Sequence, residues 1–130
     1  MSNSKLIFVA DDDQFFLTLV EKRLGEMGYE VKSFSMGEEL LKNIGSKPDL
    51  IILDYIFQSK TSNPVLSGKE IFQRIQMINE KIPVIMLSGQ EDGDVVLELA
   101  RMGIEDYVIK GKSFIDNLLE AMNEVFAREE

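Results

Sequence analysis

Acidic residues stand directly after two short apolar runs of this sequence. Three aspartates at residues 11–13 follow the first run, Leu6–Ala10. Asp54 directly follows the second run, at residues 50–53. Two carboxylates about 4 Å apart repel by roughly 4 kcal/mol at an effective dielectric constant near 20, so such a cluster favours a bound cation. A few oxygen ligands, with room for water and phosphate oxygens, suit Mg²⁺ better than Ca²⁺. We therefore expect a magnesium site.

Two further polar residues also follow apolar runs and complete a set suited to phosphoryl transfer. Ser88 follows residues 84–87, and Lys110 follows residues 107–109. Phosphoryl transfer is catalysed mainly by positioning and by neutralising the charge of the phosphate oxygens. Asp54 is the candidate carboxylate nucleophile. Lys110 would supply a cation, and the Ser88 hydroxyl a hydrogen bond, to the same phosphate.

The composition excludes most other catalytic machinery. The 130 residues include no Cys and no His, so a zinc cluster, a thiol nucleophile and a serine-histidine triad are all excluded. The length fits one domain over residues 1–130, and 45% apolar residues support a core. A formal net charge of −9 would repel nucleic acid and anionic lipid, which favours a protein partner. The first apolar run is too short for a signal-peptide core or a membrane span, so we expect a cytoplasmic location.

Apolar runs predict the strands that would carry these residues. Four runs are apolar throughout, as expected of strands buried on both faces of a parallel sheet. They cover residues 6–10, 50–53, 84–87 and 107–109. Residues 29–34 instead alternate apolar side chains with Glu30 and Lys32, which is typical of an edge strand with one wet face.

Stretches with helical spacing lie between the strands. Their apolar residues recur three and four positions apart, from Phe16 to Met27, Leu40 to Ile44, Ile71 to Ile78, Val96 to Ala100 and Ile115 to Phe126. Asp13 is a candidate cap of the first helix, and Gly28 and Gly103 stand where a left-handed residue ends a helix. Serines with an acid three residues on predict three more helix starts, at Ser35 with Glu38, Ser67 with Glu70 and Ser113 with Asp116.

Strand and helix thus alternate five times along the chain. This alternation predicts an α/β fold, a three-layer sandwich around a parallel sheet with right-handed crossovers. In such a sheet the carboxyl ends of all strands emerge at one edge, and ligands bind there where the strand order reverses. The acidic residues 11–13, Asp54, Ser88 and Lys110 should therefore meet at that edge.

The chain resembles the receiver domain of two-component response regulators over essentially its whole length. The matching features are the acidic pair Asp11 and Asp12, Asp54 closing Pro48-Asp-Leu-Ile-Ile-Leu-Asp, Ser88 after Ile82-Pro-Val-Ile-Met-Leu, and Lys110 in Asp106-Tyr-Val-Ile-Lys. Each motif is weak alone, but their order along the chain is specific. The resemblance implies a flavodoxin-like, doubly wound five-stranded parallel sheet in the order 2-1-3-4-5.

The resemblance also implies roles for the residues at the metal site. Asp12 and Asp54 would bind Mg²⁺ directly and Asp11 through water, while the Ile56 carbonyl completes the set. Asp13 would then be a bystander.

The resemblance further implies a signalling switch rather than an enzyme acting on a separate substrate. A histidine kinase or phosphotransfer protein would phosphorylate Asp54, and autocatalytic hydrolysis would remove the group. Ser88 and Tyr107 match the switch pair of the family, in which the hydroxyl moves to the phosphate and the aromatic ring turns inward. With no output domain expected, the signal would reach an unknown protein target through the fourth helix, fifth strand and fifth helix, where Met102 and Ile104 add apolar contact.

The chain departs from the family pattern near the phosphorylation site. The segment before Gly68 is longer than usual, and its polar residues 59–64 are expected to be mobile and to cover Asp54 or shape partner choice. Ile56 and Gln90 occupy the positions that tune dephosphorylation in the family, and we expect a long-lived phosphoryl state.

The residue after Lys110 departs from the family as well. Gly111 stands where family members usually have Pro joined by a cis peptide. We expect a trans bond here, because a cis bond to a non-proline residue costs about 3 to 4 kcal/mol.

Two other functions compete with this interpretation. A pseudo-receiver would keep the fold as an interaction module without being phosphorylated, and the long segment and the missing Pro leave that reading open. A phosphohydrolase of the haloacid-dehalogenase type would need a second acid two residues after the nucleophile, where this sequence has Ile56.

Overall fold

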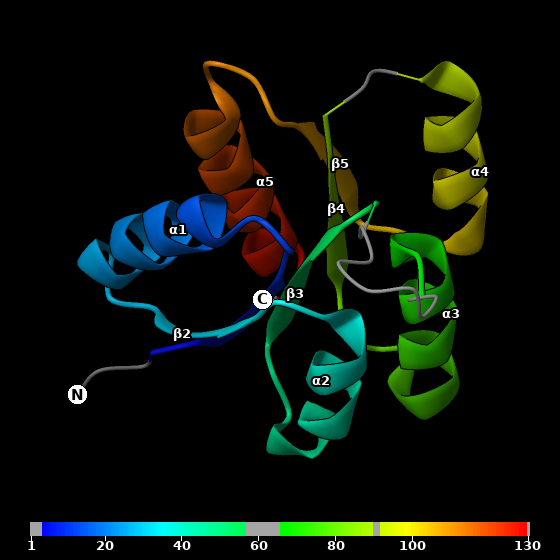
Figure 1. The fold of residues 1–130 in the computed structure, drawn as a ribbon, viewed down its shortest axis with the longest axis horizontal. Helices are drawn as coiled ribbons and strands as arrows, with labels where there is room; N and C mark the ends of the chain where they lie inside the picture. Colours follow the sequence, from blue (N-terminus) through cyan, green and yellow to red (C-terminus); the bar gives the residue numbers. More distant parts are fainter. Residues whose placement is uncertain (1–3, 57–65, 90–91, 130) are drawn as a thin grey trace.

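Strands and helices alternate along the chain in the computed structural model, which describes residues 4–56, 66–89 and 92–129 (Figure 1). The elements are β1 (Leu6–Ala10), α1 (Gln14–Glu26), β2 (Glu30–Phe34), α2 (Gly37–Lys42), a 3₁₀ turn (Ile44–Ser46), β3 (Leu50–Asp54), α3 (Gly68–Asn79), β4 (Val84–Ser88), α4 (Gly93–Met102), β5 (Asp106–Ile109) and α5 (Phe114–Arg128). The segment 59–64 and Gln90, which carried two of the expectations above, lie outside the described residues. Among the helices of the described ranges, none has the length and apolar character needed to cross a membrane.

The five strands form one parallel sheet in the order β2-β1-β3-β4-β5, as expected. Every residue of β3 and β4 is buried, which explains why their sequences are apolar almost throughout. The edge strand β2 is partly exposed, in agreement with its alternating sequence. The chain runs from β1 outward to β2 and then returns past β1 to β3, so the strand order reverses at the carboxyl ends of β1 and β3.

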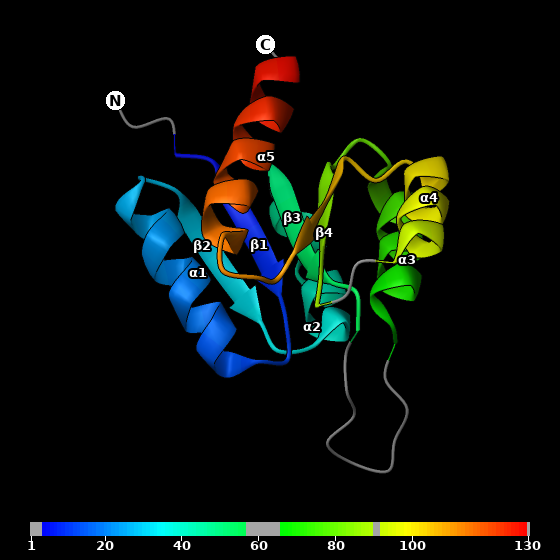
Figure 2. The same cartoon turned by 90° about the horizontal axis from the view of Figure 1, so that it is seen from above.

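Helices cover both faces of the sheet, and the fold is the predicted three-layer α/β sandwich (Figure 2). Helices α1 and α5 pack on one face, and α2, α3 and α4 pack on the other. Successive residues of β1 point to opposite faces. Ile7 and Val9 join the first layer of core, while Phe8 and Ala10 join the second.

Two glycines end helical segments as their positions predicted. Gly28 has φ 93° and Gly103 has φ 100°, in the left-handed region that glycine adopts without steric cost. Gly103 is the C-cap of α4, and its N–H donates to the carbonyls of Leu99 and Ala100.

The predicted cap at Ser35 is wrong. Helix α2 begins after Met36, and no side chain of the described residues caps it. The Glu38 carboxylate, expected to fold back on its own helix, instead accepts a hydrogen bond from the backbone N–H of Leu66 at 3.2 Å. A donor distant in the sequence has therefore replaced the local one.

Two other serines give a matched test of capping. Ser67 Oγ accepts from Glu70 N at 3.2 Å and Glu70 Oε1 accepts from Ser67 N at 3.0 Å, which is the predicted capping box. Ser113 precedes α5, but within the described residues its side chain makes no capping hydrogen bond. We expect Ser67→Ala to lower the free energy of unfolding by about 1 kcal/mol and Ser113→Ala to change it by less than about 0.5 kcal/mol, measured by urea denaturation. Equal losses in the two variants would contradict the assignment.

Candidate functional site

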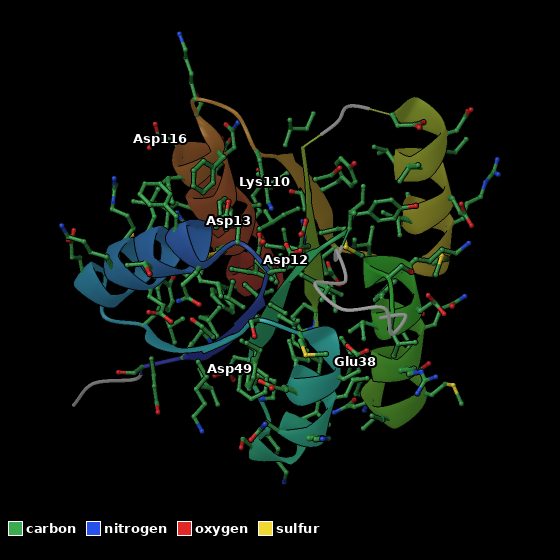
Figure 3. The ribbon with its side chains drawn as sticks, viewed as in Figure 1. Asp12, Asp13, Glu38, Asp49, Lys110 and Asp116 are labelled. Atoms are coloured by element: carbon green, nitrogen blue, oxygen red, sulfur yellow. The ribbon has the colours of Figure 1, made fainter. Side chains whose placement is uncertain are left out.

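The side chains predicted at the strand ends converge at the carboxyl edge of the sheet. Lys110 Nζ lies 2.6 Å from Asp11 Oδ2 and 3.3 Å from Asp54 Oδ1, so one ammonium bridges the ends of β1 and β3. Figure 3 shows Asp12 and Lys110 toward this edge, with Asp49 near the opposite end of the sheet. The backbone N–H of Lys110 also donates to the carbonyl of Ser88 at 2.8 Å, which ties the segment after β5 to the end of β4.

Three of the predicted acidic residues form a group that suits a metal ion. Asp11, Asp12 and Asp54 each offer a carboxylate oxygen, and these oxygens lie within 4.8 Å of one another. Asp11 is 0% exposed and Asp54 is 5% exposed, while Asp12 is half-buried. An all-oxygen donor set with one partly open side matches the preference of Mg²⁺, which keeps several water ligands. These residues therefore fit the magnesium ion that the sequence predicted.

The electrostatics of the group agree with a need for positive charge. Burial, and next the charge of Asp11, raise the pKa of Asp54 to about 7. Burial likewise raises the pKa of Asp11. Burial also opposes the charge of Lys110, but the hydrogen bond and charge of Asp11, together with the charge of Asp54, outweigh it and raise the pKa of Lys110. The Lys110 ammonium pairs with two of the three carboxylates in the group, and a divalent cation would relieve the remaining repulsion.

The structure places the other predicted site residues as follows. Ser88 is the last residue of β4 and is 3% exposed. Tyr107 is half-buried in β5, opposite Met86 of β4. Ile56 lies two residues beyond Asp54 and is 50% exposed. The switch role of Ser88 and Tyr107 and the metal ligation by the Ile56 carbonyl stay predictions.

The peptide bond between Lys110 and Gly111 is trans, as expected. The described residues contain no cis peptide bond. Lys110 therefore reaches the site without the cis-Pro corner that the family pattern would supply.

Phe16 is a neighbour of the site that the sequence pattern does not reveal, because the pattern predicts only an apolar residue of the first helix. Its ring centroid lies 4.5 Å from Lys110 Nζ. Its position in the sequence could have indicated this contact, because Phe16 is the first buried residue of α1 after the acidic cluster. The backbone N–H of Phe16 donates to Asp13 Oδ1 at 3.2 Å, which confirms Asp13 as the cap of α1.

Asp12 and Asp13 are adjacent, but substitutions of the two residues should affect different properties, Mg²⁺ binding for Asp12 and stability for Asp13. Asp13 caps α1 and is outside the carboxylate group. We expect Asp13→Ala to lower the free energy of unfolding by about 1 kcal/mol and to change the Mg²⁺ dissociation constant by less than about threefold. Asp12→Ala should weaken Mg²⁺ binding by at least about tenfold. Isothermal titration calorimetry measures Mg²⁺ binding, and urea denaturation measures the free energy of unfolding. Asp13→Asn is the control that keeps the cap. Equal loss of Mg²⁺ binding in both alanine variants would contradict this division.

Comparison with known proteins identifies related sequences. A family model described as the response regulator receiver domain matches residues 7–123. The alkaline phosphatase synthesis transcriptional regulatory protein PhoP of Bacillus subtilis is 37% identical over 109 residues, which cover 82% of this chain and 42% of that protein. The transcriptional regulatory protein PrrA of Mycobacterium leprae is 30% identical over 109 residues, covering 83% of this chain and 44% of that protein. The chain thus spans less than half the length of these relatives.

Solved structures show the same architecture. The response regulator DrrB of Thermotoga maritima, an OmpR/PhoB homologue, superposes with a TM-score of 0.81 at 31% identity, covering 98% of this chain and 54% of that chain. A CheY-like receiver domain protein from Methanospirillum hungatei gives a TM-score of 0.81 at 23% identity, covering 98% of both chains. The second likeness supports the fold alone.

Proposed function

Since this chain belongs to the response-regulator receiver family and has its CheY-like fold, we propose that it is a phosphorelay switch in which Asp54 accepts a phosphoryl group beside Mg²⁺. The observation that carries the proposal is the bridge from Lys110 to both Asp11 and Asp54 within a group of three carboxylates. This arrangement supports the proposal, because the proposed nucleophile lies beside a cation and among carboxylates that fit Mg²⁺. Receiver domains are switches rather than classical enzymes, and the chemistry proposed here is confined to the protein's own aspartate.

The proposed step is a displacement at phosphorus. An oxygen of the Asp54 carboxylate attacks the phosphorus of the donor, and a new P–O bond forms. The bond between phosphorus and the donor's leaving atom breaks, and the leaving group departs with that electron pair. Bound Mg²⁺ would supply neutralisation of the negative charge on the phosphate oxygens. The Lys110 ammonium would contact a second phosphate oxygen, and the Ser88 hydroxyl would donate a hydrogen bond to a third.

The proposed partners are a histidine kinase or a phosphotransfer protein as donor, and a protein as target. The signalling surface would be formed by α4, β5 and α5. A groove of about 350 Å³ between α4 and β5 supports this choice, with Ile104 and Tyr107 among its lining residues. Of the residues described in α4, Leu99 is the buried one. A helix with so little buried apolar surface can shift at low free-energy cost, as a switch requires.

Several finer expectations belong to the same proposal. We propose a single receiver unit over residues 1–130, at work in the cytoplasm. The long-lived phosphoryl state also stays a prediction. It is supported by the apolar side chain of Ile56, which cannot orient an attacking water by hydrogen bonding.

Intact mass after incubation with acetyl phosphate and Mg²⁺ tests the proposed function. The native chain should gain one phosphoryl group, with acetate as the leaving group, and EDTA should prevent the gain. Asp54→Asn should gain nothing. Asp49→Asn is the matched control, because Asp49 accepts a hydrogen bond from Leu6 N at 2.7 Å, near the other end of the sheet. It should be phosphorylated like the native chain.

Two outcomes would overturn the proposal. One is an adduct that survives the Asp54→Asn substitution. The other is a folded native chain that gains no adduct, which would instead favour the pseudo-receiver.

A further inference from the structure

The backbone at Lys110 leaves the position of its ammonium undecided. Hydrogen bonds fix the backbone here, since the Lys110 N–H donates to the Ser88 carbonyl and the Gly111 N–H to the Ile109 carbonyl. They do not fix the tip of the Lys110 side chain, and Gly111 has no side chain to pack against it. A Cβ built on Gly111 would meet no atom of the described residues within 4 Å. A lysine side chain is long and flexible, so the place of its ammonium depends on the contacts made at its tip.

Among the described residues, three side chains lie close to that ammonium. Two are the carboxylates of Asp11 at 2.6 Å and Asp54 at 3.3 Å, and the third is the Phe16 ring at 4.5 Å from its centroid. The carboxylates are the partners that change during the proposed cycle, because Mg²⁺ would share them and Asp54 would carry the phosphoryl group. The ring has no charge and no exchangeable proton, so its attraction for a cation persists in every state.

The Phe16 ring is itself held in place. It is 7% exposed, and it stacks on the ring of Phe114 with centroids 4.7 Å apart and 29° between the planes. The Phe16 N–H is bonded to Asp13 in the cap of α1, and Phe114 is the first residue of α5. The aromatic pair therefore joins the starts of two helices into a rigid surface beside the ammonium. Burial strengthens a cation–π contact because it removes competing water.

We propose that Phe16 is a positioning residue for Lys110, holding its ammonium between Asp11 and Asp54 by a cation–π contact so that it is in place for the incoming phosphate. This inference rests on the proposed function of Asp54. It assigns to an aromatic side chain of α1 the placement that the backbone after β5 does not provide.

The rate of phosphorylation by acetyl phosphate at saturating Mg²⁺ tests the role. Phe16→Leu keeps an apolar side chain and removes the ring, and we expect it to slow adduct formation by about 3- to 10-fold. Phe16→Tyr keeps the ring and should stay within about twofold of the native rate. Should the leucine variant fail to fold, Phe16→Met provides the same comparison.

Phe126 offers a matched control in the same core layer. Phe126 is 8% exposed, and the Lys5 ammonium lies 4.7 Å from its ring centroid, but it belongs to the last turns of α5. Phe126→Leu removes an equivalent ring and should leave the phosphorylation rate at the native value. In a Lys110→Met background, Phe16→Leu should cause no further slowing, because the residue through which it acts is gone.

Each alternative result is decisive. The inference would be overturned if Phe16→Leu and Phe126→Leu slowed phosphorylation equally, or if Phe16→Tyr did not retain the native rate. It would also be overturned if Phe16→Leu slowed phosphorylation as much in the Lys110→Met background as in the native chain. If the native chain is not phosphorylated, the proposed function fails. The contact between Phe16 and Lys110 is then tested by urea denaturation of Phe16→Leu, Lys110→Met and the double variant. Additive changes in the free energy of unfolding for Phe16→Leu and Lys110→Met would then overturn it.

Discussion

Replacing Asp54 with Asn is expected to raise the free energy of unfolding of the metal-free protein at pH 8 by about 2 to 4 kcal/mol. Burial and the charge of Asp11 raise the pKa of Asp54 to about 7, from the ordinary value of 3.8. At pH 8 the native protein must therefore hold an ionised carboxylate in a place that favours the neutral form. Asparagine has nearly the same shape and carries no charge, so the variant avoids that cost.

The raised pKa also fixes the sign of the pH dependence. Between about pH 4 and pH 7 the folded protein binds a proton at Asp54 that the unfolded chain has released. Stability from this group is thus fully present below the unfolded pKa and is lost as the pH rises through about 7. The native protein should become less stable across that window, while Asp54→Asn should lack this part of the dependence.

Urea denaturation in EDTA at pH 5 and at pH 8 measures both effects. Mg²⁺ added at pH 8 should restore much of the stability of the native protein and have a far smaller effect on Asp54→Asn. Asp49→Asn, which alters a carboxylate near the opposite end of the sheet, should not be stabilised. A metal-free Asp54→Asn variant no more stable than the native protein at pH 8 would contradict the charge balance described for the site.

Gly68→Ala is expected to lower the free energy of unfolding by about 1 to 3 kcal/mol and to slow phosphorylation. Gly68 begins α3 directly against the end of β3, where its N–H donates to the carbonyl of Tyr55 at 2.9 Å. An added Cβ would overlap the carbonyl oxygen of Asp54 and would lie 2.6 Å from Tyr55 Cα. These are backbone atoms, so relief requires moving the strand end that carries the nucleophile.

Gly25 in α1 is the matched control for this substitution. A Cβ added there meets no atom of the described residues within 4 Å. Gly25→Ala should leave phosphorylation unchanged and stabilise the protein by about 0.5 to 1 kcal/mol, because alanine loses less conformational entropy in a helix. Urea denaturation and the rate of adduct formation compare the two variants. A Gly68→Ala protein as stable and as reactive as Gly25→Ala would show that α3 can move away from β3 without loss.

Much of the fold was predictable because its determinants are local. Strands buried on both faces need apolar residues at every position, and β3 and β4 show this directly. The capping box at Ser67 was also predictable, since both of its partners lie within one turn. The predicted cap at Ser35 was wrong for the opposite reason, because Glu38 accepts a hydrogen bond from Leu66, which is distant in the sequence. The strand order followed from family resemblance, and periodicity alone did not specify it.

At the site, the order of strands and polar residues along the chain was enough to predict which residues meet. Parallel strands must present their carboxyl ends at one edge, so Asp54 and the residues after β1 and β5 had to converge. How these residues share charge could not be predicted in the same way, because it depends on distances and burial in the folded protein. The raised pKa of Asp54 depends on burial and on the distance to Asp11, and the ammonium of Lys110 is placed by carboxylates and by the ring of Phe16. These contacts join parts of the chain that lie far apart in sequence, and no local pattern encodes their distances.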